Sequence, residues 1–281
     1  MPGMIDHIVI VDQNLETMVQ QAESIGFTVV PGGEHAGGMT HNALIPFRDG
    51  SYIELIAFIE PEQRSTHRWW PRLWKGGGLV DFALLCDDLE AEVEEIRRRG
   101  LEVPEAVENG RLRPDGQRLE WRQSFPQTVV GETGMPFLIE DVTPRSLRVP
   151  SSDAEVTHRN GVVGIAGITL LVDDLDSASR SLAAITGNDA TAIEPPFPGT
   201  LRAARTNVGT EPGHWIVVAT ADPSKSEDQG EDALPARYIA KYGSGPFSAV
   251  LTSGRSPAEL RPSDGELVDV ELLAASRLRI A

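Results

Sequence analysis

The sequence IDHIVIVDQNL at residues 5–15 decides the fold, because the chain repeats its pattern twice. An apolar run of strand length is followed by a pair of acidic or amide residues suited to cap a helix, then a leucine and a polar-faced helix. The copies at residues 80–89 and 166–175 read VDFALLCDDL and AGITLLVDDL. A spacing of roughly 80 residues is too long for a solenoid repeat and suits a half-domain module. The sequence therefore predicts a duplicated module.

Composition and charge restrict the possible partners. The 281 residues are enough for one large or two ordinary domains. A formal net charge of −17 repels phosphate backbones and anionic membrane surfaces, so we expect neither nucleic acid nor a membrane as a partner. The single cysteine, Cys86, excludes an internal disulfide, and its apolar strand indicates a core residue rather than a nucleophile. With no signal-like or membrane-spanning apolar run in the sequence, we expect a cytoplasmic protein.

The first module reads as β-α-β-β-β. Residues 5–11 predict a strand and residues 15–26 a helix that stops at Gly26, followed by a short strand at 27–30. Residues 40–47 and 51–58 predict two strands joined by an Asp-Gly hairpin signal. The glycine-rich residues 31–38 are expected to form a loop that either approaches a ligand or is merely mobile.

The second module repeats this order. It predicts a strand at 80–86, a helix at 89–99, and strands near 101–103, 117–125 and 136–142. The polar residues 144–160 are the expected boundary between a domain at 1–150, made of two paired modules, and a domain at 151–281 with one clear module and one degenerate module. The predicted fold class is α+β, with repeated βαβββ modules.

Two strands of the first module carry polar side chains that could form a site. A histidine in an apolar strand, such as His7, is on spacing alone most often a hydrogen-bonded core residue. Glu54 lies inside another apolar strand, where a carboxylate needs a partner or a metal, because burying it alone costs several kcal/mol. The pair could supply nitrogen and oxygen ligands to a divalent ion with positions left open for substrate. The alternative is a buried hydrogen bond between His7 and Glu54.

The second module offers carboxylates at the corresponding places. Aligning the leucines puts Asp81 opposite His7, and aligning the last strands puts Glu140 opposite Glu54. If the two modules pair about a pseudo-twofold axis, we expect these four side chains to converge. Any site should therefore belong to the first two modules, because the third carries residues that cannot bind a metal at these places, Gly167 and Val217.

Several fragments in order carry a family resemblance: His7, GGEH at 32–35 followed by THNAL at 40–44, YIEL at 52–55, RPDG at 113–116 with Leu119 and Trp121, and PFLIE at 136–140. This set resembles the glyoxalase-like domain family of the vicinal oxygen chelate superfamily, over residues 4–185. The resemblance implies that the modules curl into half-barrels of mixed sheet with helices outside. In the superfamily's enzymes the enclosed site holds a divalent metal chelated by adjacent substrate oxygens, whereas some members only bind or sequester a small molecule.

The resemblance also implies roles for individual residues. His7 and Glu54 match metal-ligand positions of a first module, and Glu140 matches the last-strand carboxylate of a second, as a further ligand or a general base. Asp81 departs from the histidine or glutamine often found there. An oxygen ligand at that place would favour Mg²⁺ or Mn²⁺ over Zn²⁺, and it is equally consistent with a site that binds no metal. The candidate ions are therefore Mn, Fe, Ni, Zn and Mg.

Five further residues are candidates for contact with a substrate. Asn42 could orient a substrate oxygen or bond within the sheet, and Arg113 could hold an anion bidentately or be a turn residue. His35 could reach the mouth of the cavity or be a solvated loop residue. Trp121 and Phe137 could wall the pocket or fill the core.

Three hypotheses for function follow. The first is a metal-dependent enzyme with lyase, isomerase or ring-cleaving dioxygenase chemistry on a small substrate with two neighbouring oxygens. The second is a non-catalytic small-molecule binding or sequestering protein, with a degenerate site whose polar side chains pair with each other. The third is an assembly role for the C-terminal module, with a homodimer formed through sheet edges.

Overall fold

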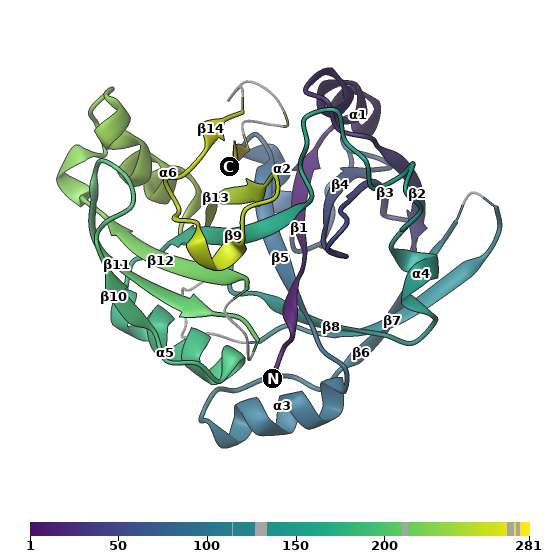
Figure 1. The fold of residues 1–281 in the computed structure, drawn as a ribbon, viewed down its shortest axis with the longest axis horizontal. Coiled ribbons are helices and arrows are strands. Elements are labelled where there is room, and N and C mark those ends of the chain that lie inside the picture. Colours follow the sequence, from purple (N-terminus) through teal and green to yellow (C-terminus); the bar gives the residue numbers. More distant parts are fainter. Residues whose placement is uncertain (114, 127–133, 210–212, 269–272, 274–275) are drawn as a thin grey trace.

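The computed structural model describes residues 1–113, 115–126, 134–209, 213–268, 273 and 276–281. Its first half forms a closed barrel, drawn in purple and blue on the right of Figure 1, with the strand order β1-β4-β3-β2-β6-β7-β8-β5. The barrel strands are β1 (Met4–Asp12), β2 (Val30–His35), β3 (Thr40–Pro46), β4 (Tyr52–Phe58), β5 (Gly78–Leu85), β6 (Val107–Leu112), β7 (Arg118–Ser124) and β8 (Phe137–Asp141).

Each of the first two modules supplies four strands to this barrel. The modules join where β1 pairs antiparallel with β5 and where β2 pairs antiparallel with β6. The α+β class and the repeated modules are thus confirmed, and the two curled half-barrels close into one barrel. The helices that follow the repeated strands lie outside it, and they are α1 (Leu15–Ser24) and α3 (Leu89–Arg98).

The repeated polar pair caps these helices as predicted. The side chains of Asn14, Asp88 and Asp174 each accept a hydrogen bond from the first turn of the helix that follows, the last being α5 (Leu175–Thr186). Helix α1 ends next to Gly26, which has a φ of 93° that glycine adopts without strain.

Two predicted segments of the barrel differ from the structure. The expected loop at residues 31–38 lies largely within β2, because its backbone pairs with both β3 and β6. The expected strand at residues 101–103 is absent, and β6 (Val107–Leu112) takes its place in the barrel. The sequence of β6 is VENGRL, whose polar residues give no alternating apolar signal.

The second half forms an open sheet with the order β10-β11-β12-β9-β13-β15-β14, on the left of Figure 1. The third module is confirmed, since β9 and α5 follow the repeated pattern and β12 pairs parallel with β9 as β4 does with β1. The strands are β9 (Gly164–Leu171), β10 (Thr191–Ile193), β11 (Thr200–Asn207), β12 (Trp215–Ala221), β13 (Gly245–Thr252), β14 (Glu266–Leu267) and β15 (Arg277–Ile280).

Shorter helices connect the strands of the two sheets. They are α2 (Trp70–Trp74), α4 (Arg145–Arg148), α6 (Leu234–Tyr242) and the 3-10 turns η1 (Pro223–Lys225), η2 (Glu231–Ala233) and η3 (Pro257–Glu259). The strand-like sequence LVDVELL at residues 267–273 lies partly outside the described residues.

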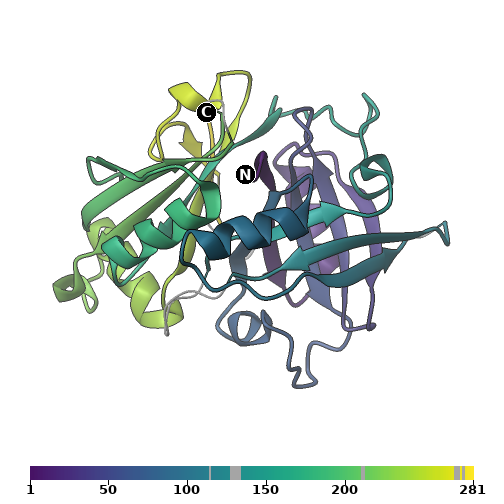
Figure 2. The same ribbon diagram turned by 90° about the horizontal axis from the view of Figure 1, so that it is seen from below.

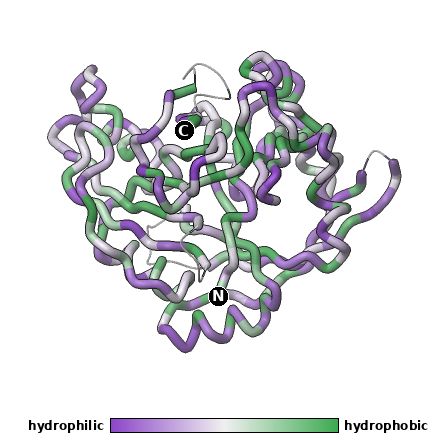
Figure 3. Tube along the Cα trace, viewed as in Figure 1, coloured by the Kyte–Doolittle hydropathy of each residue, from purple (hydrophilic) through white to green (hydrophobic). Residues whose placement is uncertain are grey.

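One hydrophobic cluster joins the two sheets. It contains Ile8 of the barrel and Ile168 and Leu251 of the open sheet, all fully buried. The apolar strands form the green interior of Figure 3, and α3 and α5 lie side by side in Figure 2. The division into domains at residue 150 stays a prediction. In the part of the chain that the structure describes, no helix is both long and apolar enough to cross a membrane.

Candidate functional site

A cavity of about 160 Å³ lies in the barrel and is lined by residues of both modules. Seven strands contribute polar or aromatic side chains to it: β1, β2, β3, β4, β6, β7 and β8. The connector before β5 adds Trp69 and Arg68 to its wall. As predicted, this cavity belongs to the first two modules.

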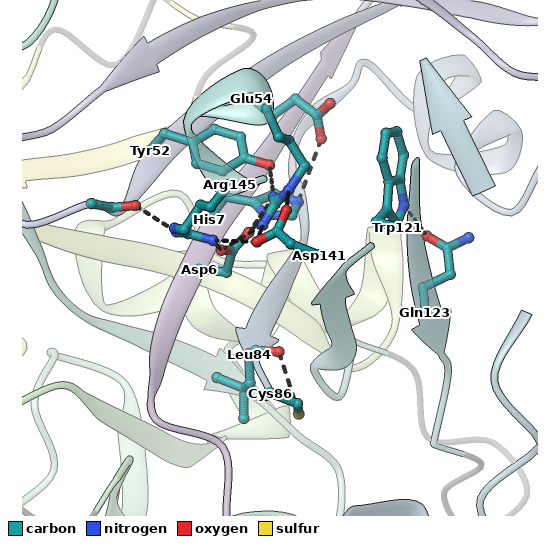
Figure 4. Close-up of polar contacts among 12 residues, drawn as sticks. Asp6, His7, Tyr52, Glu54, Leu84, Cys86, Trp121, Gln123, Asp141 and Arg145 are labelled. Atoms are coloured by element: carbon teal, nitrogen blue, oxygen red, sulfur yellow. Dashed lines mark hydrogen bonds and ion pairs between the residues drawn. The ribbon is translucent and has the colours of Figure 1, made fainter. Parts of the chain in front are cut away.

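His7 of β1 points into the cavity and is held on its far side by Asp6. The His7 Nδ1 atom lies 2.6 Å from Asp6 Oδ2, and the imidazole stacks on the Tyr52 ring with centroids 4.5 Å apart. Neighbours in a strand normally point to opposite faces, but Asp6 is the extra residue of a β-bulge between Ile5 and His7. Figure 4 shows this contact.

Asp6 is fully buried and forms ion pairs with two arginines. It accepts hydrogen bonds from Arg148 at 2.7 and 3.1 Å and from Arg145, and Arg148 also donates to Asp141 and to the Tyr52 hydroxyl. Burial alone would raise the pKa of Asp6, but the charge of Arg148, the His7 hydrogen bond and Arg145 outweigh it and hold that pKa well below its usual range.

This network fixes the tautomer of His7. An ionised Asp6 requires the proton on Nδ1 of a neutral His7, so the lone pair is on Nε2. His7 Nε2 faces Glu54, 3.5 Å from its Oε2, which is longer than an ordinary hydrogen bond. His7 Nε2 therefore faces the cavity without an ordinary hydrogen-bond partner among the described residues.

Glu54 of β4 is the centre of the polar part of the cavity. Its Oε1 accepts a hydrogen bond from the Asn42 amide and lies 3.2 Å from His35 Nε2. Burial alone would raise the pKa of Glu54, but the hydrogen bond and charge of His35, then His7 and Asn42, lower it to about 2. Glu54 is therefore ionised at neutral pH.

Other predicted cavity residues, from both modules, lie here too. His35 is in β2 rather than in a loop, and its Nδ1 lies 2.9 Å from the Thr40 hydroxyl. Trp121 and Phe137 both line the cavity, where they contact His35 and His7 edge-on at centroid distances of 6.1 and 5.4 Å.

Asp81 is buried but does not line the cavity. Its carboxylate accepts a hydrogen bond from Trp69 Nε1 at 2.9 Å and pairs with Arg68 at 3.0 Å. Burial raises the pKa of Asp81, even though Arg68 and Trp69 oppose that shift. Asp81 therefore does not join His7 and Glu54 in the cavity as predicted, because Arg68 and Trp69, which line the cavity, hold its carboxylate.

The predicted convergence of Glu140 on this group is wrong. Glu140 pairs with Arg122 at 2.7 Å and accepts the backbone N–H of Leu89 at the start of α3. Val9 pairs with Glu54, and Ala83, which the repeat aligns with Val9, pairs with Phe137. Phe137, three residues before Glu140, therefore lies at the position in the second module that Glu54 has in the first.

Arg113 also lies elsewhere. It donates to the Leu147 carbonyl at 3.1 Å, pairs with Asp115, and lines a separate cleft next to α4. The arginines that do line the cavity are Arg68, Arg111 and Arg148, none of which we predicted. In β6 the buried Arg111 is followed by the exposed Leu112, which places Arg111 on the inner face. We did not predict this, because the sequence of β6 gives no strand signal.

With this geometry in place, the sequence can be compared with known families. Residues 5–186 match a family described as glyoxalase-like domain. The chain belongs to the glyoxalase-like domain family, within the vicinal oxygen chelate superfamily. No curated protein matches it.

Solved structures resemble this glyoxalase-like protein in fold. A hypothetical protein from Staphylococcus aureus is 12% identical, with 99% of this chain and 98% of that chain covered and a TM-score of 0.70. A mutant 4-hydroxymandelate synthase from Streptomyces coelicolor is 11% identical, with 89% and 71% covered and a TM-score of 0.58. A fusion protein containing 4-hydroxyphenylpyruvate dioxygenase is 15% identical, with 90% and 36% covered and a TM-score of 0.51.

Superfamily members generally use a divalent metal, which needs several His, Cys, Asp or Glu ligands close together. Within the described parts of this glyoxalase-like chain, no three His, Cys, Asp or Glu side chains are grouped so that they could hold a metal ion. Asp81 is held by Arg68 and Trp69, and the position matching Glu54 in the second module is Phe137. The arrangement therefore does not fit a metal centre with three protein ligands.

Proposed function

We propose that this protein binds a small organic molecule in the barrel cavity and moves a proton on it, with His7 as the general base. The observation that carries the proposal is the contact between Asp6 and His7, which leaves Nε2 free on the cavity side. A buried carboxylate that orients an imidazole in this way is a recurring feature of general-base catalysis. The reaction class is isomerase or lyase chemistry at a carbon next to a carbonyl.

Glu54 has a different role in this proposal. With a pKa of about 2 it is too weak a base to accept a proton from carbon. Its charge lies 3.5 Å from His7 Nε2, where it stabilises the imidazolium that forms when His7 takes the proton. Asn42 and His35 keep the carboxylate in that position through Oε1.

The size of the cavity limits the ligand. Its volume of about 160 Å³ is below the roughly 300–1,000 Å³ of pockets for drug-sized ligands, so the ligand is a small metabolite. The aromatic rings of Trp121, Phe125 and Phe137 supply its apolar wall.

Proton exchange with solvent tests the proposal. The protein is incubated in D₂O with pyruvate, phenylpyruvate and hydroxyacetone, and loss of the C–H signal next to the carbonyl is followed by ¹H NMR. We expect catalysed exchange for at least one compound and a loss of roughly 100-fold or more in His7→Gln. Equal exchange by His7→Gln, or no exchange with any compound, would contradict the proposal.

Elemental analysis separates this proposal from the metal-dependent alternative. The protein, purified without an affinity tag, is compared with His7→Ala and Glu54→Ala variants after reconstitution with Mn²⁺, Fe²⁺, Ni²⁺ and Zn²⁺. We expect far less than one metal per chain in all three. About one metal per chain in the wild type, lost in both variants, would support a metal-dependent lyase, isomerase or dioxygenase instead.

A further inference from the structure

Arg111 is a buried cation that pairs with no carboxylate of the described residues. Its residue is 5% exposed, and its Nη1 and Nη2 donate to two neutral oxygens, Asn42 Oδ1 at 3.0 Å and the Arg148 carbonyl at 3.1 Å. In the described parts of the chain its Nε has no hydrogen-bond partner and no carboxylate forms an ion pair with it. Burying a charge in this way costs several kcal/mol unless something compensates it.

The other two arginines of the cavity differ from Arg111 in this respect. Arg148 pairs with Asp6 and Asp141, and Arg68 pairs with Asp81. The protein thus provides an acidic partner for each arginine that lines the cavity except Arg111. Burial lowers the pKa of Arg111, and the carboxylate of Glu54 only partly offsets that shift.

Asn42 separates Arg111 from Glu54 and fixes both. Its Oδ1 accepts from Arg111, and its Nδ2 donates to Glu54 Oε1. Gly32 packs against this contact so closely that a Cβ would overlap Asn42 Oδ1 and Arg111 Nη1. The guanidinium is therefore held in one place by neutral acceptors, and three of its five N–H groups make no hydrogen bond within the described parts of the chain.

We propose that Arg111 binds the carboxylate of a small planar organic acid in the cavity. The proposal rests on the proposed function, because it names the ligand class of the same cavity. A carboxylate would give Arg111 the direct ion pair that the described residues do not provide, and guanidinium groups bind carboxylates through paired N–H donors. The rings of Trp121, Phe125 and Phe137 offer flat apolar contacts for the remainder of the acid.

The test compares two probes that differ mainly in charge. Binding of benzoate and of benzamide is measured by isothermal titration calorimetry on the wild type, Arg111→Met and the matched control Arg113→Met. We expect the wild type and Arg113→Met to bind benzoate roughly tenfold or more tightly than benzamide, and Arg111→Met to lose that preference. Equal binding of both probes, binding of neither, or an unchanged preference in Arg111→Met would overturn the proposal. Tighter binding of phenyl phosphate than of benzoate would overturn the choice of a carboxylate.

Two further measurements keep the result interpretable. If Arg111→Met does not fold, the Nε–H resonance of Arg111 in ¹⁵N-labelled wild type is followed instead, after assignment with Arg111→Lys. Benzoate should shift it and benzamide should not. Glu140→Gln should keep the preference for benzoate, since Glu140 pairs with Arg122 and lies outside the cavity. Failure of proton exchange with this preference intact would refute the proposed function but not the anion site.

Discussion

Replacing Arg148 by methionine should strongly destabilise the protein. Arg148 is 3% exposed and donates to Asp6, Asp141 and the Tyr52 hydroxyl. Removing it takes away two of the hydrogen bonds to the fully buried Asp6, at 2.7 and 3.1 Å. Breaking a buried ion pair by deleting one partner costs about 3–5 kcal/mol, because it leaves the other charge uncompensated.

Urea unfolding followed by circular dichroism measures this loss. With a slope of about 3 kcal/mol/M, a loss of 3–5 kcal/mol lowers the unfolding midpoint by roughly 1–1.7 M. The control is Arg122→Met, whose arginine pairs with Glu90 and Glu140 at the surface and should cost at most about 1 kcal/mol. Equal midpoint shifts in the two variants would refute the assignment of Arg148 as the main counterion of Asp6.

The pH dependence of the same variant gives an independent check. The pKa of Asp6 is lower in the folded protein than in the unfolded chain, so its contribution is complete above about pH 3.9. That contribution is lost as the pH falls through the lower, folded pKa. The difference in unfolding free energy between wild type and Arg148→Met should therefore be constant near neutrality and shrink in acid. A difference that grows in acid would contradict this sign.

Two predictions concern residues outside the cavity. Glu140→Gln should keep proton exchange within about twofold of wild type and lose at most about 1 kcal/mol of stability, since its partners Arg122 and Leu89 belong to the outside of the barrel; a large loss of exchange in the NMR assay would place Glu140 in the site after all. Cys86 is 4% exposed and burial raises its pKa, so a thiol reagent such as DTNB should react slowly with the native protein and rapidly in urea; fast reaction of the native protein would contradict its core position.

The modules and part of the site could be predicted because they depend on local patterns. The strand-helix signature, with caps at Asn14, Asp88 and Asp174, was readable because helix capping uses a few residue types at fixed positions. His7 and Glu54 were readable because a polar residue inside an apolar strand needs a partner. Strand β6 could not be predicted, because its sequence is polar and it forms a strand only through pairing with β2 and β7.

The remaining errors in the predicted site follow from the register in which the strands pair. The strand near residues 136–142 was predicted, but the pairing of Ala83 with Phe137 was not, and a shift of three residues moves Glu140 to the other face of β8. The contact between Asp6 and His7 was not predicted, because neighbours in a regular strand point to opposite faces and a β-bulge cannot be predicted from that alternation. Arg111 and Arg148 required the tertiary fold, since their partners come from distant parts of the chain.

The second sheet shows why the third module does not repeat the polar cavity of the barrel. Trp215 pairs with Gly167 as Tyr52 pairs with His7, and the indole packs so close to Gly167 that a Cβ there would overlap its ring. The missing side chain at Gly167 makes room for Trp215, which is fully buried with Phe247 and α6 against the same face. The repeated signature is kept because it forms the strands and helices. The inward residues are free to differ, so aromatic packing replaces the polar site.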